Sequence, residues 1–318
     1  MPDDRELADT QAAGALLADR FPGQAATDEA VVAAQAHLGS DEALRKAPFG
    51  FLFWFALVWV GLVFLAAILA PVLPLANPNF QDYNAINQAP NIHHLLGTDD
   101  LGRDLLSRLI FGARVSLFVG FFAVIIGLVI GGTLGLVSGY KGGVLDISLN
   151  AASFIILAFP AIVAVIAIVA FWGHSLLKIT IILGVATIPL KFRVIRASSL
   201  AFAQRDFVVA AKTMGARTSR ILFKEILPNV VPVALTFSLI SMAGIIVVEG
   251  TLAFLGLSIP LPTSSWGNMI SEGSSNGNLS LNPYIMLWPA FSMFLLLWAI
   301  NLIGDRLRKR FDIREGVL

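Results

Sequence analysis

Long apolar runs separated by short polar segments dominate the chain after residue 48. Six runs approach or exceed the length of about 20 residues that a helix needs to cross a bilayer. They are residues 49–75, 115–137, 147–173, 179–197, 230–259 and 284–304. Four runs contain no charged residue, the fifth contains only Glu249, and the fourth is apolar until Lys191. We expect six transmembrane helices, with Lys191, Arg193 and Arg196 extending their stems to the interface at one helix end.

Composition supports an all-α, polytopic membrane protein. Hydrophobic residues make up 57% of the 318 residues and charged residues only 14%, whereas soluble domains carry about a quarter charged residues. Because the chain has no cysteine, it can form no disulfide, thiolate nucleophile or thiolate metal site. The net charge of +1 gives no sign of a nucleic-acid partner.

The first 47 residues form a separate acidic, Ala-rich segment, and residues 48–318 form the membrane domain. Nine acidic and four basic residues lie before Phe49. The first apolar run begins too late for a cleaved secretory signal, so we expect the tail to remain in the cytoplasm. Its composition favours a solvated, partly disordered extension over a weak helix.

The distribution of basic residues predicts the orientation. With the N-terminus inside, the cytoplasmic segments contain 18 Lys and Arg residues and the outer segments contain four. This asymmetry predicts cytoplasmic N- and C-termini in a multi-pass protein of the cell membrane.

The outer segment 77–114 has apolar residues at helical spacing around position 105. We expect an amphipathic helix capped by Thr98 or Asp99 that leads into the second span. Charged residues on its other side are candidates for mutual pairing or for contact with an outer partner: Asp99, Asp100, Arg103, Asp104 and Arg108. His93 and His94 lack a third spaced ligand, so a metal site is not expected.

The cytoplasmic segment of about residues 199–228 has the pattern of two short helices with a break at Gly215. One apolar stripe comprises Phe207, Val208, Ala211 and Met214, and the other comprises Ile221, Leu222, Ile226 and Leu227. Pro228 is expected to end the second helix. Charge alone leaves two interpretations open, a docking element for a cytoplasmic partner or an ordinary basic loop.

This segment resembles the EAA loop of permease subunits of binding-protein-dependent ABC importers. That pattern is Glu-Ala-Ala, three residues, Gly, nine residues, and Ile-x-Leu-Pro. Here Val209, Ala210 and Ala211 precede Gly215 at the same spacing, and Glu225-Ile226-Leu227-Pro228 follows nine residues later. Val209 replaces the usual Glu, and Glu225 stands where Ile is common. The substitution at Val209 puts in doubt one polar contact with an ATPase but not the shape of the loop.

Three further segments resemble the C-type permeases of dipeptide, oligopeptide and nickel importers. They are residues 94–116 (HLLGTDDLGRDLLSRLIFGARVS), the segment 254–269 that contains FLGL and PTSSWGNM, and the C-terminal segment that begins NLIGDRLR at Asn301. The resemblance covers about residues 49–315. It implies a type I ABC importer transmembrane domain that forms half of a translocation pathway.

The resemblance also implies the partners. They are a sister permease in a heterodimer, one or two ATPase subunits, an extracytoplasmic binding protein received by segments 77–114 and 260–283, and the surrounding lipid. No Gly-Lys pair of a phosphate-binding loop occurs in the chain, so the chain is not an enzyme, and ATP and Mg²⁺ would be bound by the ATPase subunits. The implied coupling-loop residues are Arg205, Asp206, Val209, Ala210, Ala211, Gly215, Ala216, Leu227 and Pro228. Peptides are the cargo that the resemblance implies most often, with nickel chelates or sugars as alternatives.

Glu249 lies within an apolar run, where a carboxylate facing lipid is costly. It is therefore either a pathway or gate residue or a buried carboxylate bonded between helices. A stand-alone secondary transporter and an integral-membrane enzyme remain rival classes, but neither explains the Gly215 loop.

Overall fold

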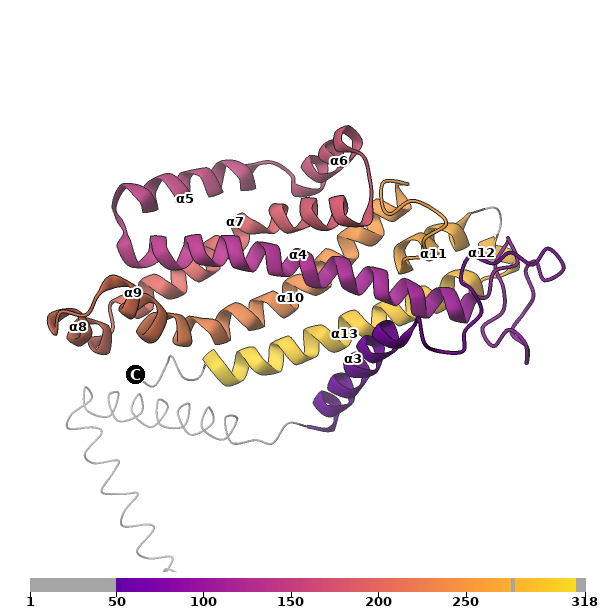
Figure 1. Cartoon of the computed structure of the whole chain (residues 1–318), viewed down its shortest axis with the longest axis horizontal. Coiled ribbons are helices and arrows are strands. Elements are labelled where there is room, and N and C mark those ends of the chain that lie inside the picture. The colour runs from indigo at the N-terminus through magenta and orange to yellow at the C-terminus, as the bar shows by residue number, and fades with distance from the viewer. Residues whose placement is uncertain (1–49, 276–277, 313–318) are drawn as a thin grey trace, which may run out of the picture. The chain divides into compact units, whose positions relative to one another are not determined.

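The computed structural model describes residues 50–275 and 278–312, and the expectations for the acidic tail fall outside these ranges. The unit Gly50–Phe311 is helical along most of its length (Figure 1). The long helices are α3 (Phe51–Leu69), α4 (Leu105–Lys141), α5 (Gly143–Ala158), α6 (Ala161–Trp172), α7 (Leu176–Ala203), α10 (Leu227–Phe254) and α13 (Tyr284–Asp312). The short helices are α8 (Asp206–Thr213), α9 (Thr218–Arg220), the π-helix η1 (Ile221–Ile226), α11 (Trp266–Ser274) and α12 (Asn278–Leu281).

Within the described ranges, four helical segments are long and apolar enough to cross a membrane. They are Phe51–Leu69, Leu105–Lys141, Thr218–Phe254 and Tyr284–Lys309. A fifth span results if α5 and α6 together form one. The predicted fourth run is helical within α7, but α7 does not belong to this group because Lys191, Arg193 and Arg196 interrupt its C-terminal half.

Helices α4 and α7 pack against each other more extensively than any other pair in the unit, through glycines spaced four residues apart on α4. A Cβ at Gly131 would lie 2.5 Å from the carbonyl oxygen of Ile188. At Gly135 it would lie 2.6 Å from the carbonyl oxygen of Phe192, and at Gly139 2.6 Å from that of Arg196. The two backbones therefore touch directly, the contact that small residues permit between membrane helices.

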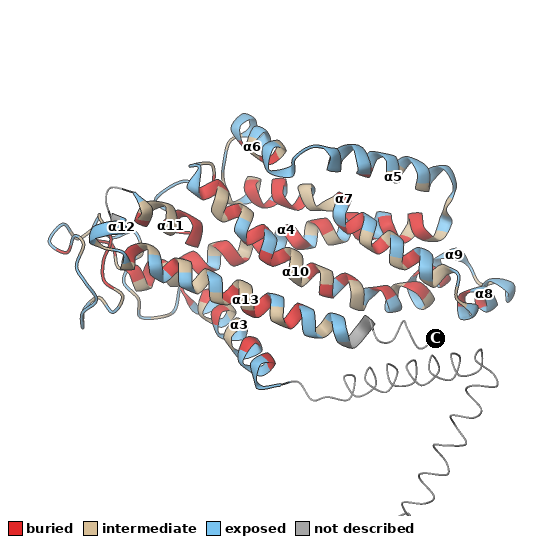
Figure 2. Cartoon of the chain, turned by 180° about the vertical axis from the view of Figure 1, so that it is seen from behind, coloured by how far each residue is buried: buried red, intermediate tan, exposed pale blue. Residues whose placement is uncertain are grey.

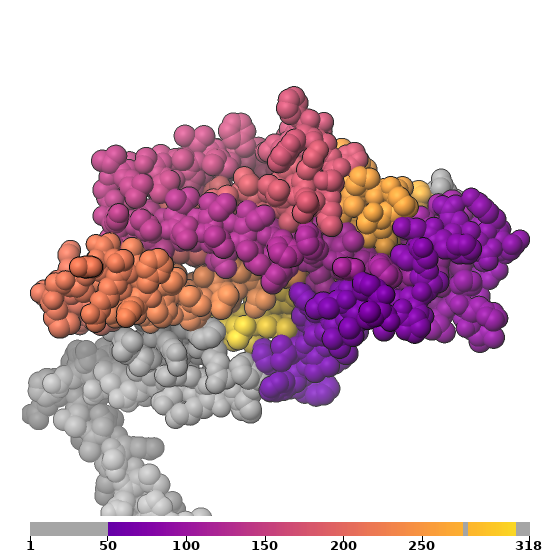
Figure 3. Space-filling model, viewed as in Figure 1, coloured from indigo at the N-terminus to yellow at the C-terminus, as the bar shows by residue number. Residues whose placement is uncertain are grey.

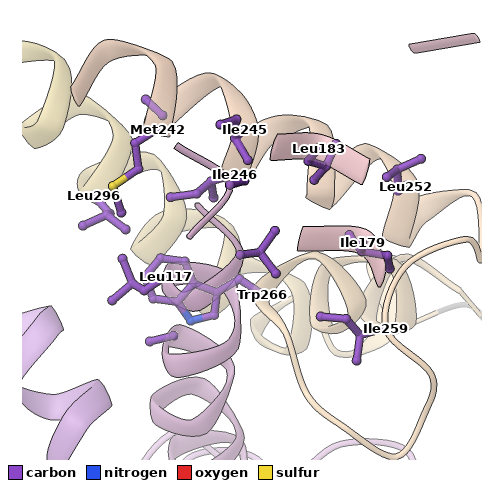
Figure 4. Close-up of a cluster of buried hydrophobic side chains, with 14 of the residues drawn as sticks. Leu117, Ile179, Leu183, Met242, Ile245, Ile246, Leu252, Ile259, Trp266 and Leu296 are labelled. Atoms are coloured by element: carbon purple, nitrogen blue, oxygen red, sulfur yellow. The ribbon is translucent and has the colours of Figure 1, made fainter. Parts of the chain in front are cut away.

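The described core lies where α4, α7, α10, α11 and α13 meet. Figure 4 shows Trp266 lying beside Leu117 of α4, with Ile246 of α10 and Leu296 of α13 nearby. The Trp266 indole is 2% exposed, and its Nε1 donates to the carbonyl oxygen of Leu109 at 2.9 Å. This arrangement ties the start of α11 to the first turns of α4.

The predicted start of the second helix is wrong. The helix begins at Leu105, and the Asp104 carboxylate caps it by accepting from the Ser107 amide at 2.8 Å. Residues 98–104 form a tight loop instead, since Asp99 accepts from the amides of Leu101 and Arg103 and Gly102 has a φ of +72°. This local bonding competes with a helical turn.

The third apolar run is not one continuous helix. Helices α5 and α6 are bent by 82° relative to each other. The reason is Pro160, which disfavours the helical conformation of the preceding Phe159 and holds it extended at φ −81° and ψ 137°. Figure 2 shows that α5 is almost entirely exposed, and within residues 143–158 Ser153 is the one buried residue.

The prediction that Pro228 ends a helix is wrong. The chain runs from α9 through η1 into α10, and Pro228 lies in the first turn of α10. The wide turns of the π-helix precede the proline, and the missing amide of a proline is tolerated in the first turn of a helix.

We predict that Gly135→Ala destabilises the protein while Gly244→Ala does not. The added methyl at position 135 would meet the backbone of α7, an overpacking cost of about 1–3 kcal/mol. Gly244 of α10 has no described atom within 4 Å of a Cβ, so alanine there should stabilise the helix by up to about 1 kcal/mol. Thermal unfolding of the two purified variants tests this, and equal melting temperatures would contradict the close contact.

Candidate functional site

The segment from Arg205 to Pro228 forms a compact helical hairpin between α7 and α10. Helix α8 reverses direction at Gly215, and α9 and η1 return the chain to the bundle. The hairpin lies at the opposite end of the unit from α11 and α12 (Figure 1). In the space-filling view it covers that end of the surface (Figure 3).

Gly215 makes the turn possible. Its φ is +79°, a left-handed conformation that a side chain disfavours. The Gly215 amide donates to the carbonyl oxygen of Lys212, and the Ala216 amide donates to that of Ala211 at 3.0 Å. The hydrogen bond from the Ala216 amide to the Ala211 carbonyl oxygen joins residues five positions apart, as in a Schellman motif. Backbone hydrogen bonds therefore define the end of α8. The predicted break at Gly215 is confirmed.

One face of the hairpin is buried against the bundle. Val208 and Ala211 of α8 pack with Ile221, Leu222 and Ile226 in one cluster, to which Leu136 of α4 and Ile195 of α7 also contribute. The predicted second apolar stripe is thus largely buried, with Leu227 half-buried. The hairpin is therefore anchored to α4 and α7.

The other face is exposed and apolar in part. Val209, Phe207 and Met214 are exposed, and Met214 keeps 80% of its surface accessible. Asp206, Ala210, Gly215 and Pro228 are exposed as well, whereas Ala211 is buried and Arg205, Ala216 and Leu227 are half-buried. Exposed Phe, Val and Met side chains on a rigid element are typical of a surface that a partner covers.

Glu249 is buried between α10 and the segment that leads to α11. The residue is 1% exposed. Its Oε1 accepts hydrogen bonds from the hydroxyl of Ser258 at 2.7 Å and from that of Ser265 at 3.0 Å. Ser265 in turn caps α11 by accepting from the Asn268 amide. This geometry fits the structural alternative for Glu249, because its bonds hold residues 258–268 against α10.

Two arginines at the start of α4 form a buried ion cluster with Asp99 and Glu272. Arg103 Nε lies 2.7 Å from Asp99 Oδ2, and Arg103 Nη2 lies 3.2 Å from Glu272 Oε2. Arg108 Nη2 contacts the same Glu272 oxygen at 2.5 Å. Glu272 belongs to α11, so the cluster joins segments that are more than 160 residues apart.

Most of the charged residues expected to contact an outer partner protein are buried or bonded within the chain. Asp99, Arg103 and Arg108 are at most 2% exposed, and charges so placed are bonded within the chain rather than presented to a partner. Asp104 caps α4 and contacts His94 Nδ1 at 3.0 Å. Asp100 is half-buried. Of the acidic partners expected for Arg103 and Arg108, the structure shows Asp99, which lies 3.5 Å from Arg108 Nε, and it adds Glu272, which the sequence did not reveal.

The prediction that Lys191 extends to the membrane interface is wrong. It is 1% exposed, between α7 and α10, where Nζ donates to Ser238 Oγ at 3.1 Å and lies 4.8 Å from the ring centroid of Phe237. The close approach of α4 at Gly131 covers its Cβ. Arg196, by contrast, forms an ion pair with Asp146 of α5, with Nη2 2.6 Å from Oδ2. The signal available in the sequence for Lys191 and Arg196 was a group of basic residues at the end of an apolar run.

Comparison with known proteins identifies the family. The sequence model described as "Binding-protein-dependent transport system inner membrane component" matches residues 131–316, which include the whole hairpin and Glu249. The chain belongs to this family. As a member, it is a permease subunit of a binding-protein-dependent ABC importer, and the predicted resemblance is confirmed.

Two curated relatives align along most of the permease. It is 38% identical over 250 residues to the dipeptide transport system permease protein DppC of Alkalihalophilus pseudofirmus, covering 78% of this chain and 81% of the relative. It is 35% identical over 258 residues to the glutathione transport system permease protein GsiD of Pectobacterium atrosepticum, covering 81% and 84%.

A solved structure shares the fold of the permease. An inward-facing conformation of the MetNI methionine ABC transporter aligns with a TM-score of 0.53 at 20% identity. The alignment covers 67% of the permease and 98% of that chain. The helical domain of the permease therefore has the fold of an ABC importer transmembrane subunit.

We predict that Glu249→Leu destabilises the permease and that Glu249→Gln does not. Leucine leaves the Ser258 and Ser265 hydroxyls without their buried acceptor, at about 1–3 kcal/mol for each lost partner. Glutamine keeps an acceptor oxygen. Thermal unfolding and uptake should be measured together: a folded Glu249→Gln complex that has lost uptake would show that the charge itself acts in the pathway.

We also predict that Lys191→Met leaves the melting temperature unchanged or higher, because methionine fills the same volume without a buried charge. Ser238→Ala should cost about 1–3 kcal/mol in the wild-type chain, since the ammonium loses its acceptor. The same substitution should cost less beside Lys191→Met. The double-mutant cycle measures this difference, and additive effects would contradict the Lys191–Ser238 contact.

Proposed function

We propose that this permease forms one half of the translocation pathway of an ATP-driven importer of di- and oligopeptides. The observation that carries the proposal is the hairpin of residues 205–228, with its buried anchor and its exposed apolar face. The names of the dipeptide and glutathione relatives support peptides over nickel chelates or sugars as the cargo.

The hairpin is the coupling element in this proposal. Helix α8 inserts into a cleft of an ATPase subunit, and Val209 presents an apolar contact at the position where the family pattern has Glu. ATP and Mg²⁺ bind to the ATPase subunits. Because the hairpin is packed on α4 and α7 through Leu136 and Ile195, a displacement of α8 would move these helices as a rigid body.

The second half of the pathway is a sister permease. In support, the apolar side chains of α5 are exposed, and a cavity of about 520 Å³ lies between α5, α6 and α7 with an apolar lining that includes Phe159, Ile168 and Val185. In a heterodimer, the sister subunit and lipid would cover these surfaces.

The proposed topology has six spans with both termini in the cytoplasm. The basic residue bias supports this orientation. Helix α7 then serves as a span that lies inside the bundle, where α4 and α10 enclose Lys191 and Asp146 of α5 pairs with Arg196. The outer segments 77–114 and 260–283 face the substrate-loaded binding protein.

We predict that Gly215→Pro abolishes ATP-driven uptake and association with the ATPase. Proline fixes φ near −65°, which is incompatible with the +79° at this turn, and it removes the amide that caps α8. Co-purification of the ATPase and uptake into proteoliposomes measure the effect, which should exceed about tenfold if more than about 1.4 kcal/mol of coupling is lost.

Gly142→Pro is the matched control. Gly142 also has a positive φ, +63°, and its amide caps α4 by donating to the carbonyl oxygen of Ser138. It lies outside the hairpin, so its variant should lose a comparable amount of stability yet retain the ATPase. If Gly215→Pro retained both ATPase and uptake, the coupling role would be wrong.

A further inference from the structure

Arg114 of α4 differs from the other basic residues near the outer end of the bundle. Arg103 and Arg108 are held in the ion cluster, and Lys178 Nζ donates to the carbonyl oxygen of Trp172 at 2.8 Å. Arg114 is exposed, and within residues 50–275 and 278–312 it makes no ion pair or hydrogen bond. Arg114 borders the apolar run of residues 115–137, where a long basic side chain extends its charged end to the interface, so its guanidinium faces water or a ligand.

A cavity of about 330 Å³ opens beside this guanidinium. Four segments line it, with Phe111 and Phe118 from α4, Asn79 from the outer segment, Leu176 from α7, and Thr263 from the loop before α11. Phe111 and Phe118 lie three and four residues from Arg114 and therefore share its face of the helix. The volume is at the lower end of the range for ligand pockets, about 300–1,000 Å³.

The chemistry of the lining selects one class of ligand. None of the described residues that line the cavity is acidic, so the site has no counter-charge for a cation. A guanidinium binds a carboxylate with two parallel hydrogen bonds. The two phenylalanines suit an apolar side chain, while the Asn79 amide can bond to peptide groups.

We propose that Arg114 binds the C-terminal carboxylate of a short peptide as it enters the pathway, with the last side chain against Phe111 and Phe118. The proposal rests on the proposed peptide-import function and adds the group that is recognised at the permease itself.

Cysteine protection tests this in the assembled complex of permeases and ATPases in lipid nanodiscs. Since the chain has no cysteine, Thr263→Cys places a single thiol on this subunit at an exposed position of the cavity. The rate at which a maleimide labels the thiol is measured with increasing trialanine or trialaninamide. Trialanine should protect the thiol, and trialaninamide should need about tenfold more, the effect of one charge-assisted bond.

The second arm removes the cation. Thr263→Cys with Arg114→Gln should lose the preference for trialanine, whereas Thr263→Cys with Lys178→Gln should keep it, because Lys178 is an outer cation that does not line the cavity. Equal protection by the two peptides, a preference that survives Arg114→Gln, or no protection by trialanine would overturn the proposal.

Failure of this site and failure of the importer function are separable. ATP hydrolysis stimulated by the substrate-loaded binding protein is measured on the same nanodiscs. Stimulated hydrolysis without trialanine protection would reject the Arg114 site and leave the importer function in place. A wild-type complex that neither retains an ATPase nor responds to a binding protein would reject the importer function.

Discussion

The direct backbone contact between α4 and α7 is the constraint on which the rest of the permease depends. Glycines at 131, 135 and 139 leave no room for a Cβ, so the two helices can pack only at this register and distance. Membrane helices gain little from the hydrophobic effect once they are in lipid, and close van der Waals packing of this kind holds them together. The pair is the rigid body to which the functional segments are attached.

One end of this helix pair carries a polar assembly, and the other end carries an apolar one. At the start of α4, Arg108 contacts Glu272 and thereby fixes α11, whose first residues also bond to Glu249 and to the carbonyl oxygen of Leu109 through Ser265 and Trp266. At the opposite end, the hairpin after α7 packs on Leu136 and Ile195. In the proposed coupling, a displacement of the hairpin would be transmitted to α4 and α7 through this packing.

The features that the sequence predicted are those set by local pattern. Apolar runs gave the positions of the long helices, and Gly215 gave the break in the hairpin because a left-handed turn requires a residue without a side chain. The residue spacing of the hairpin also gave the family. These signals lie within a few residues of the structure that they determine.

The features that it missed depend on tertiary contacts. Glu272 pairs with Arg103 and Arg108 across more than 160 residues, and no local pattern marks it as their partner. Lys191 was expected at an interface, but the approach of α4 and α10 encloses it. The sequence shows both Pro160 and Pro228, but their effects differ. Pro160 lies at the 82° bend between α5 and α6, whereas Pro228 lies in the first turn of α10, directly after a π-helix. The difference lies in the turns that precede each proline.

Site-directed cross-linking tests most directly whether the hairpin docks on an ATPase subunit. A single cysteine in place of Met214, which directly follows α8 and is 80% exposed, would carry a short photoactivatable cross-linker in the assembled complex. If the hairpin is the coupling element, a covalent product with the ATPase should form from this position, and none from a cysteine in place of the exposed Leu261 at the other end of the unit. An ATPase product from Leu261, or none from Met214 in a complex that hydrolyses ATP, would contradict it.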